Sequence, residues 1–241
     1  MTDGMPPTPD GSSAPDRRPR VPHVRGLVLA AGSGQRMGGP KALVRIEAGG
    51  PTLVERAVHV LVDGGCDGVT VVVGAAADEV REIVSCLGRD VDVVESPFWH
   101  EGMGASLRSG LSSLVRRPRE GETPVCAALV LLVDLPDVGS DVVARVLDHV
   151  SEGVGEGVGE GVGDDAPAGA RWRSALGRAA YAGRSGHPVL LGRDHWADVV
   201  AGAVGDHGAR GYFRDHEHVI VDCSDLATGR DVDRPEDLPG A

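Results

Sequence analysis

Residues 29–43 read LAAGSGQRMGGPKAL, a glycine-rich turn that begins where the short apolar run 24–30 ends. A glycine-rich turn behind a strand is a common position for phosphate binding in open α/β sheets. Neither of the two common phosphate loops is present, however. The dinucleotide fingerprint requires a glycine where Met37 stands, and the P-loop requires a lysine where Pro40 stands. The stretch therefore predicts an α/β fold with a phosphate loop of another kind.

The chemistry of this loop comes from two glycines and two cations. Gly32 and Gly34 allow main-chain N–H groups to face inward as an anion nest. Arg36 suits bidentate contact with phosphate oxygens, and Lys41 adds a point charge. This combination favours a triphosphate ligand over a single phosphate. The alternative is an ordinary glycine turn that carries two solvated cations.

Apolar runs alternate with segments of helical spacing along most of the chain. Thr52 and Glu55 form a capping box that predicts a helix to about residue 63, and the continuously apolar run 127–133 predicts a strand buried on both faces. The other expected elements are strands at 24–30, 69–73, 91–95, 179–182, 188–191 and 219–223, helices at 78–87, 103–115, 142–150 and 195–204, and an apolar turn at 209–213. This order predicts a doubly wound, mostly parallel sheet of the Rossmann-like type.

Two segments depart from this alternation. Residues 1–22 are rich in Pro, Ser, Asp and Arg, which predicts a disordered tail without the apolar run of a signal peptide. Residues 151–170 contain EGVG three times and are interpreted as a flexible acidic insert. The rest of 23–241 is then expected to form a single domain around that insert.

Composition argues against several classes of protein. The net charge of −12 makes general binding to nucleic acid unfavourable. No apolar run approaches the roughly 20 residues that cross a bilayer, so no membrane role is expected. Cys66, Cys86, Cys126 and Cys223 lie far apart in the sequence, and we interpret them as buried, reduced thiols of a cytoplasmic protein.

Three aspartates are candidate metal ligands. Asp134 directly follows the run 127–133, so it is expected at a strand end, either as a ligand or as a helix cap. Asp231 and Asp233 are two residues apart and would point to the same face of a strand. One of the pair could complete a Mg²⁺ site; the alternative is a solvated acidic chain end.

The stretch 29–43 resembles the signature of the MobA/MocA-like nucleotidyltransferases, most closely that of the molybdenum cofactor cytidylyltransferases, although Gly34 stands where the family often has serine. Five later segments resemble further motifs of this family in the expected order: GMGASLRSGL (102–111), LVDLPDV (132–138), GHPVLL (186–191), GDHGARGYF (205–213) and DVDRPEDL (231–238). The resemblance spans about residues 24–238 apart from the insert. It implies a GT-A-like nucleotidyltransferase fold.

The resemblance also implies a reaction and its residues. A phosphate oxygen of an acceptor would attack the α-phosphorus of an NTP, with Mg²⁺ as cofactor and pyrophosphate as leaving group. The implied catalytic residues are Arg36, Lys41 and Asp134, and the implied metal ligands are Asp134, Asp231 and Asp233. The implied nucleotide contacts are Leu29, Ala30, Ala31, Gly32, Gly34, Arg36, Lys41, Gly102, Met103 and Ser106. The implied acceptor contacts are Gly186, His187, Pro188, Asp206 and Arg210. Helix capping by Ser106 and a purely structural role for His187 are the alternatives.

Ala31 and the pair Pro40-Lys41 favour the cytidylyl branch of the family over the guanylyl branch. The resulting hypothesis is transfer of CMP from CTP to the phosphate of a molybdopterin-type cofactor. The implied partners are the NTP, the phosphorylated pterin, and a molybdenum hydroxylase or its chaperone. The alternatives are a guanylyltransferase, an NTP transferase for another phosphorylated acceptor, and a non-catalytic maturation protein of the same fold.

Overall fold

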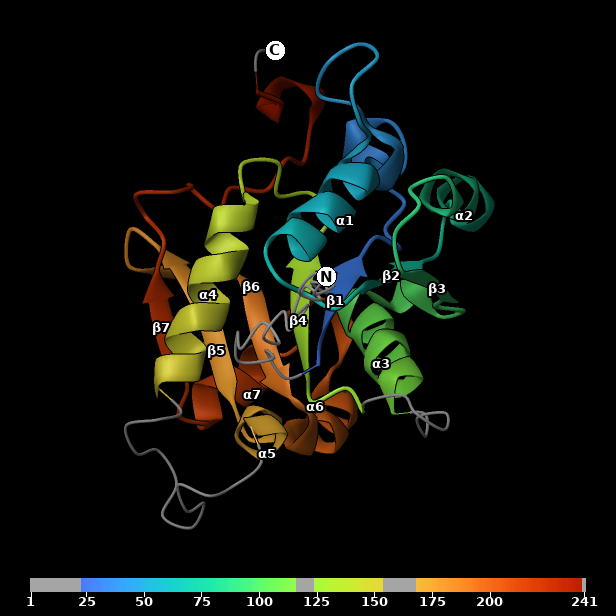
Figure 1. Cartoon of the computed structure of the whole chain (residues 1–241). Coiled ribbons are helices and arrows are strands. Elements are labelled where there is room, and N and C mark those ends of the chain that lie inside the picture. Colours follow the sequence, from blue (N-terminus) through green and yellow to red (C-terminus); the bar gives the residue numbers. More distant parts are fainter. Residues whose placement is uncertain (1–22, 116–123, 154–167, 240–241) are drawn as a thin grey trace, which may run out of the picture.

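The computed structural model describes residues 23–115, 124–153 and 168–239. Its centre is a seven-stranded sheet in the order β3-β2-β1-β4-β6-β5-β7 (Figure 1). β6 is antiparallel to both of its neighbours, and every other neighbouring pair is parallel. The strands are β1 (Val24–Leu29), β2 (Val69–Val73), β3 (Val91–Glu95), β4 (Ala127–Leu132), β5 (Leu176–Tyr181), β6 (Arg184–Gly192) and β7 (Val219–Asp222). The predicted doubly wound, mostly parallel sheet is confirmed.

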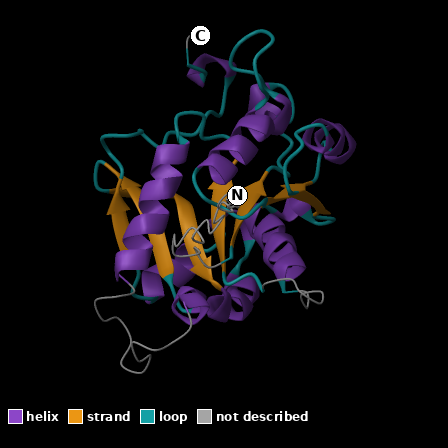
Figure 2. Ribbon diagram, in the orientation of Figure 1, coloured by secondary structure: helices purple, strands orange, loops and turns teal. Residues whose placement is uncertain are grey.

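Helices cover both faces of the sheet (Figure 2). Their bounds are α1 (Leu53–Asp63), α2 (Ala77–Ser85), α3 (Met103–Leu114), α4 (Ser140–Gly153), α5 (Ala168–Arg173), α6 (Trp196–Gly202) and α7 (Arg210–Asp215). The buried residues of α1, α2 and α4 belong to one core cluster, and those of α3, α6 and α7 belong to another. The two clusters lie on opposite faces, since alternate residues of the inner strands, such as Val28 and Leu29 of β1, divide between them.

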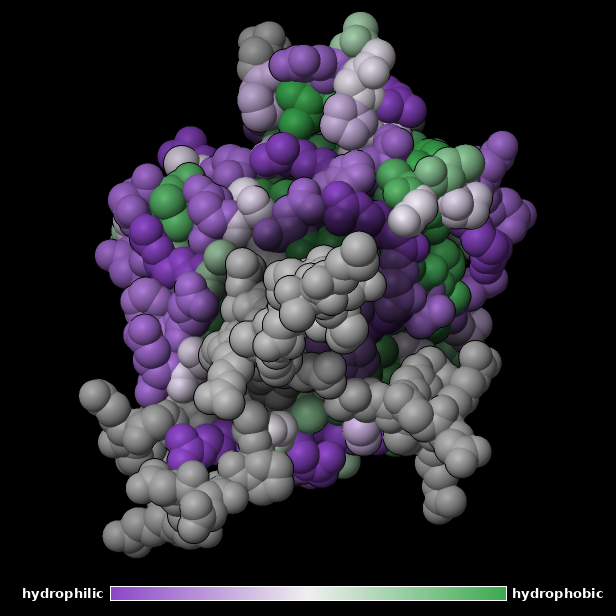
Figure 3. Space-filling view, in the orientation of Figure 1, coloured by the Kyte–Doolittle hydropathy of each residue, from purple (hydrophilic) through white to green (hydrophobic). Residues whose placement is uncertain are grey.

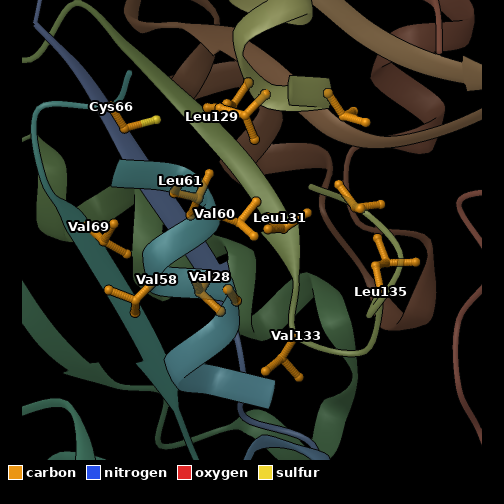
Figure 4. Close-up of a cluster of buried hydrophobic side chains, with 14 of the residues drawn as sticks. Val28, Val58, Val60, Leu61, Cys66, Val69, Leu129, Leu131, Val133 and Leu135 are labelled. Atoms are coloured by element: carbon orange, nitrogen blue, oxygen red, sulfur yellow. The ribbon is translucent and has the colours of Figure 1, made fainter. Parts of the chain in front are cut away.

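The first cluster shows how the sheet is held rigid near the end of β1. Val58 and Leu61 of α1 pack towards Val28 of β1 and Leu129 of β4, and all four side chains are fully buried (Figure 4). Burial of one such side chain contributes about 1.5–3 kcal/mol. The predicted capping box starts α1, because the Thr52 hydroxyl accepts a hydrogen bond from the Glu55 N–H and the Glu55 carboxylate accepts one from the Thr52 N–H.

The predicted insert 151–170 is wrong at both ends. Helix α4, which packs on β5 and β7, continues to Gly153, three residues beyond the predicted end at residue 150. At the other end, α5 begins at Ala168 and Trp172 is buried against the core. Residues 154–167 lie outside the described residues, as does the predicted tail 1–22.

Two further predictions need correction. The segment 209–213 is not an apolar turn but most of α7, which buries Phe213 beneath the sheet. Cys86 is exposed rather than buried, because it follows the last residue of α2, whereas the other three cysteines are buried free thiols.

The surface in Figure 3 is largely hydrophilic where described residues are visible. Within the described ranges, no helix combines the length and the apolar character that a membrane crossing requires.

The strand order places a topological switch point between β1 and β4. From β1 the chain continues to β2 on one side, whereas β4 lies on the other side in parallel register, with Leu29 opposite Leu132. Open α/β sheets bind their ligands outside the carboxyl ends of two such strands. The loop after β1 and the chain's C-terminal segment meet above these two ends (Figure 1).

Candidate active site

The loop after β1 is shaped by Gly34. This residue has a φ of 58°, and a Cβ there would lie 2.0 Å from the carbonyl oxygen of Gly39. The Gly34 carbonyl accepts hydrogen bonds from the N–H groups of Met37 and Gly39, which folds the loop back on itself. Only glycine tolerates both the left-handed conformation and the close contact. The compact loop presents Arg36 on its exposed side and leads directly to Lys41.

Lys41 lies at the centre of a charged cluster. Its Nζ donates hydrogen bonds of 2.7 Å to Asp134 Oδ2 and of 2.7 Å to Asp233 Oδ1. The Arg36 Nη1 atom lies 2.8 Å from the other oxygen of Asp233. The side chains of Lys41, Asp134 and Asp233 are 17%, 18% and 31% exposed, whereas that of Arg36 is 68% exposed. The structure thus brings together all three residues predicted to be catalytic.

Mutual stabilisation sets the protonation states of this cluster. Burial by itself lowers the pKa of Lys41, but Asp134 and Asp233 outweigh burial and raise it, so the amine stays charged. Burial raises the pKa of Asp134, and Lys41 offsets this only in part. The hydrogen bond from Lys41 lowers the pKa of Asp233. Asp134 is therefore the member whose negative charge the fold stabilises least.

The C-terminal segment is fixed beside β4 by its main chain. The Val232 N–H donates to the Asp134 carbonyl at 2.9 Å, and the Val232 side chain is buried. Residues 231–233 form no strand, contrary to the geometry expected for the two aspartates. Asp231 and Asp233 nevertheless flank the buried Val232, and a carboxylate oxygen of each lies within 4.8 Å of one of Asp134.

The three aspartates fit a hard divalent cation. One carboxylate oxygen from each of Asp134, Asp231 and Asp233 lies within 4.8 Å of the other two. The Oδ1 atom of Asp134 is buried without a hydrogen-bond partner, which is costly unless a ligand completes its environment. Carboxylate oxygens are the ligands preferred by Mg²⁺ and Mn²⁺. The donor set and the unpartnered oxygen therefore suit a metal ion.

The predicted nucleotide contacts at the end of β1 differ in accessibility. Leu29, Ala30 and Ala31 are buried. Ala30 donates its N–H to Val72, and Ala31 accepts through its carbonyl from Ala75, so both main chains also join β1 to the end of β2. Gly32 is exposed, and a Cβ there would have no atom within 4 Å. Gly32 is thus the residue of this run that offers open space to a ligand.

The start of α3 joins two of the predicted contact groups. Gly102 has a φ of 109°, and a Cβ on it would lie 2.5 Å from Asp206 Oδ1. Met103 lies next to Gly208, since a Cβ added to Gly208 would lie 3.2 Å from the Met103 sulfur. Ser106 is buried in the first turn and does not cap the helix, whose N-cap is Gly102 without a side-chain bond. Residues predicted for the nucleotide and for the acceptor therefore adjoin one another.

Among the other predicted acceptor residues, Gly186, His187 and Pro188 lie where β6 approaches the carboxyl end of β4, whereas Arg210 is the first residue of α7. His187 precedes a cis peptide bond to Pro188, and its carbonyl accepts from the Tyr181 hydroxyl at 2.7 Å. Burial, with Arg178 and Arg210 nearby, lowers the pKa of His187 to about 4, so its imidazole is neutral at physiological pH. Sequence reasoning missed Arg178. The sequence feature that could have indicated it is the position of Arg178 directly before the expected strand 179–182.

Residues 26–219 match the model of the MobA-like NTP transferase domain. The chain belongs to this family. It is therefore a nucleotidyltransferase, and the family resemblance inferred from six sequence motifs is confirmed.

Individual MobA-like relatives extend the comparison. The chain is 32% identical over 231 residues to nicotine blue oxidoreductase of Paenarthrobacter nicotinovorans, covering 90% of this chain and 96% of the relative. The crystal structure of Rv0371c from Mycobacterium tuberculosis superimposes with a TM-score of 0.64 at 27% identity and covers 90% of this chain and 95% of that chain. A manganese complex of Rv0371c superimposes with a TM-score of 0.55 at 26% identity, covering 83% and 86%. Manganese is thus bound by a protein whose fold is similar to that of this chain.

Proposed function

We propose that this MobA-like protein transfers CMP from CTP to the phosphate of a molybdopterin-type cofactor with Mg²⁺ as cofactor. The observation that carries the proposal is the meeting of Lys41, Asp134 and Asp233 at the switch point between β1 and β4. A cation and two carboxylates at this position suit a metal-bound triphosphate, whose transfer depends on positioning and charge neutralisation.

In this reaction an acceptor phosphate oxygen forms a bond to the α-phosphorus, and the bond from the α-phosphorus to the pyrophosphate oxygen breaks. Asp134, with Asp231 and Asp233, would hold the Mg²⁺, which neutralises phosphate charge when bound. Lys41 and Arg36 would contact the β- and γ-phosphates and stabilise the charge that develops on pyrophosphate. Gly32, Gly34 and the main chain of Leu29–Ala31 would line the nucleotide, together with Gly102, Met103 and Ser106.

The choice of CTP rests on Ala31 and on Pro40 before Lys41, the residues that favour the cytidylyl branch. The acceptor would lie against Gly186, His187, Pro188, Asp206 and Arg210. The neutral imidazole of His187 can donate a hydrogen bond without adding charge. A molybdenum hydroxylase or its chaperone would then receive the product.

The test is release of pyrophosphate by the full chain supplied with Mg²⁺, each of the four NTPs in turn, and molybdopterin-type cofactor. We expect CTP to be the best donor and Asp134→Asn to be inactive. Glu236→Gln should be unaffected, because Glu236 is an exposed acid of the C-terminal segment that lies outside the triad of Asp134, Asp231 and Asp233. A preference for GTP would replace the cytidylyl assignment, and turnover only with another phosphorylated acceptor would replace the pterin. Absence of pyrophosphate with every donor and acceptor would leave a non-catalytic maturation role.

The 32% identity to nicotine blue oxidoreductase makes a redox reaction a second candidate. Its test is loss of the absorbance of nicotine blue with a reduced nicotinamide dinucleotide as electron donor. Turnover of the pigment without pyrophosphate release from any NTP would assign this function instead.

A further inference from the structure

Arg178 lies on the face of the sheet that carries α3, α6 and α7. In β5 it pairs with Val189 of β6, and Val189 in turn pairs with Val130 of β4. Its guanidinium carbon lies 5.2 Å from the ring centre of Phe213 in α7. Two strand spacings separate β5 from β4, so Arg178 lies about 10 Å across the sheet from the strand that ends before Asp134. It therefore borders the region assigned above to the acceptor.

The guanidinium of Arg178 is incompletely satisfied. Its Nε is buried and has no hydrogen-bond partner, and its Nη2 makes only a long contact of 3.4 Å to the Gly186 carbonyl. Burying such a donor without a partner costs free energy comparable to a lost hydrogen bond, and more for a charged group. The cation–π contact to Phe213 holds the group in place but provides no acceptor atom for the N–H.

A second cation compounds the unbalanced charge. Burial and then Arg210 lower the pKa of Arg178, and burial followed by the two arginines lowers the pKa of His187. Among the described residues, none of the ion pairs joins a carboxylate to Arg178 or to Arg210. Arg210 begins α7 and lies three residues, about one helical turn, before Phe213, whose ring Arg178 faces. Both guanidinium groups therefore belong to the side of the sheet that carries α7, where they can contact one anion.

We propose that Arg178 and Arg210 form the anion-binding half of the acceptor site and bind the doubly charged phosphate group of a phosphomonoester, with His187 as a neutral neighbour. This inference rests on the proposed function for the identity of the site as the acceptor's. Arg178 thereby becomes a specificity-determining residue, because an acceptor without the phosphate leaves its charge unbalanced. Arginine suits the task through its planar fork of N–H donors.

The test uses inorganic phosphate as the probe and no nucleotide, so its outcome is independent of nucleotidyl transfer. Phosphate is titrated into the full chain at constant ionic strength, and the imidazole resonances of His187 are followed by NMR. The variants are Arg178→Met and Arg210→Met, with Arg184→Met as a matched control, because Arg184 is an exposed arginine of the same β5–β6 hairpin. Arg210 is also exposed, so its variant keeps the test decisive if Arg178→Met fails to fold.

We expect saturable shifts at His187 in the wild type and in Arg184→Met, with Kd raised about 10- to 100-fold in each of the other two variants. An unchanged Kd in Arg210→Met, or phosphate shifts confined to the loop at 32–41, would overturn the proposal. With an acceptor that supports pyrophosphate release, Arg178→Lys should raise the KM for that acceptor and leave the KM for the NTP unchanged. Phosphate binding without any pyrophosphate release would refute the proposed function and retain the anion site.

Discussion

Replacing Lys41 by methionine is expected to change metal affinity and catalysis in opposite directions. Lys41 Nζ lies 2.7 Å from one oxygen of Asp134 and 2.7 Å from one oxygen of Asp233, so it competes with a metal ion for the same carboxylates. Removal of this cation should strengthen metal binding. The same change removes the charge that would neutralise the leaving pyrophosphate and should slow turnover.

The size of the first effect follows from the geometry. Two unit charges 4 Å apart interact by about 4 kcal/mol at an effective dielectric constant of about 20. Lys41, Asp134 and Asp233 are 17–31% exposed, and the flexible lysine can swing away when an ion binds. We therefore expect about a third of the full interaction, about 1.4 kcal/mol, or tenfold tighter binding.

Mn²⁺ binding is measured by calorimetry without nucleotide, and turnover by pyrophosphate release. We expect kcat to fall about 100- to 1,000-fold in Lys41→Met, as for loss of one preorganised charge-stabilising group. Arg36→Met serves as the comparison, because its exposed guanidinium contacts only Asp233 of the triad and should change both quantities less. Weaker or unchanged Mn²⁺ binding in Lys41→Met, or a kcat within about threefold of the wild type, would refute the reasoning.

Three other predictions concern the same region. Gly34→Ala should lower the free energy of unfolding by about 1–3 kcal/mol, because Gly34 has a φ of 58° and an added Cβ would clash with the Gly39 carbonyl. Gly32→Ala, where an added Cβ meets open space, should leave the denaturant midpoint unchanged and weaken only nucleotide binding. Equal denaturant midpoints for the two variants would contradict this prediction. Asp134→Asn should raise Tm at pH 7 while abolishing activity. Burial raises the folded pKa of Asp134 above 3.8, so the buried negative charge destabilises the fold fully at any pH above that folded pKa. The asparagine removes this charge, and its stabilising effect should therefore vanish below about pH 3.8, where the aspartate is protonated in both states. A lower Tm of Asp134→Asn at pH 7 would contradict this prediction. His187 has a folded pKa of about 4 against an ordinary value of 6.5, so on acidification the unfolded chain binds a proton at this residue before the folded chain does. Stability should therefore fall as the pH drops from 6.5 towards 4, and the fall should be smaller in His187→Gln. An NMR titration that gives His187 a pKa near 6.5 in the folded protein would refute this prediction.

Much of the fold was predictable because its signals are local. Continuous apolar runs marked β2 and β4 within one residue of their observed ends, since strands buried on both faces leave no alternation to misread. The capping box at Thr52 placed the start of α1. The insert bounds were wrong, because the glycine-rich composition of 151–170 conceals the last residues of α4 and the start of α5, a helix that packs on β6 and buries Trp172.

The features of the candidate site also fall into those that the sequence determined and those that only the tertiary structure determined. Sequence alone determined the loop after β1, the strand-end position of Asp134 and the family, because each depends on residues close together in the chain or on their order. Only the tertiary structure decided that Lys41 bridges Asp134 and Asp233, which lies 192 residues from Lys41, and that Arg178 faces the Phe213 ring with a buried, unpartnered Nε. Charge–charge distances across a sheet depend on strand order and register, and these are set by the packing of the whole domain.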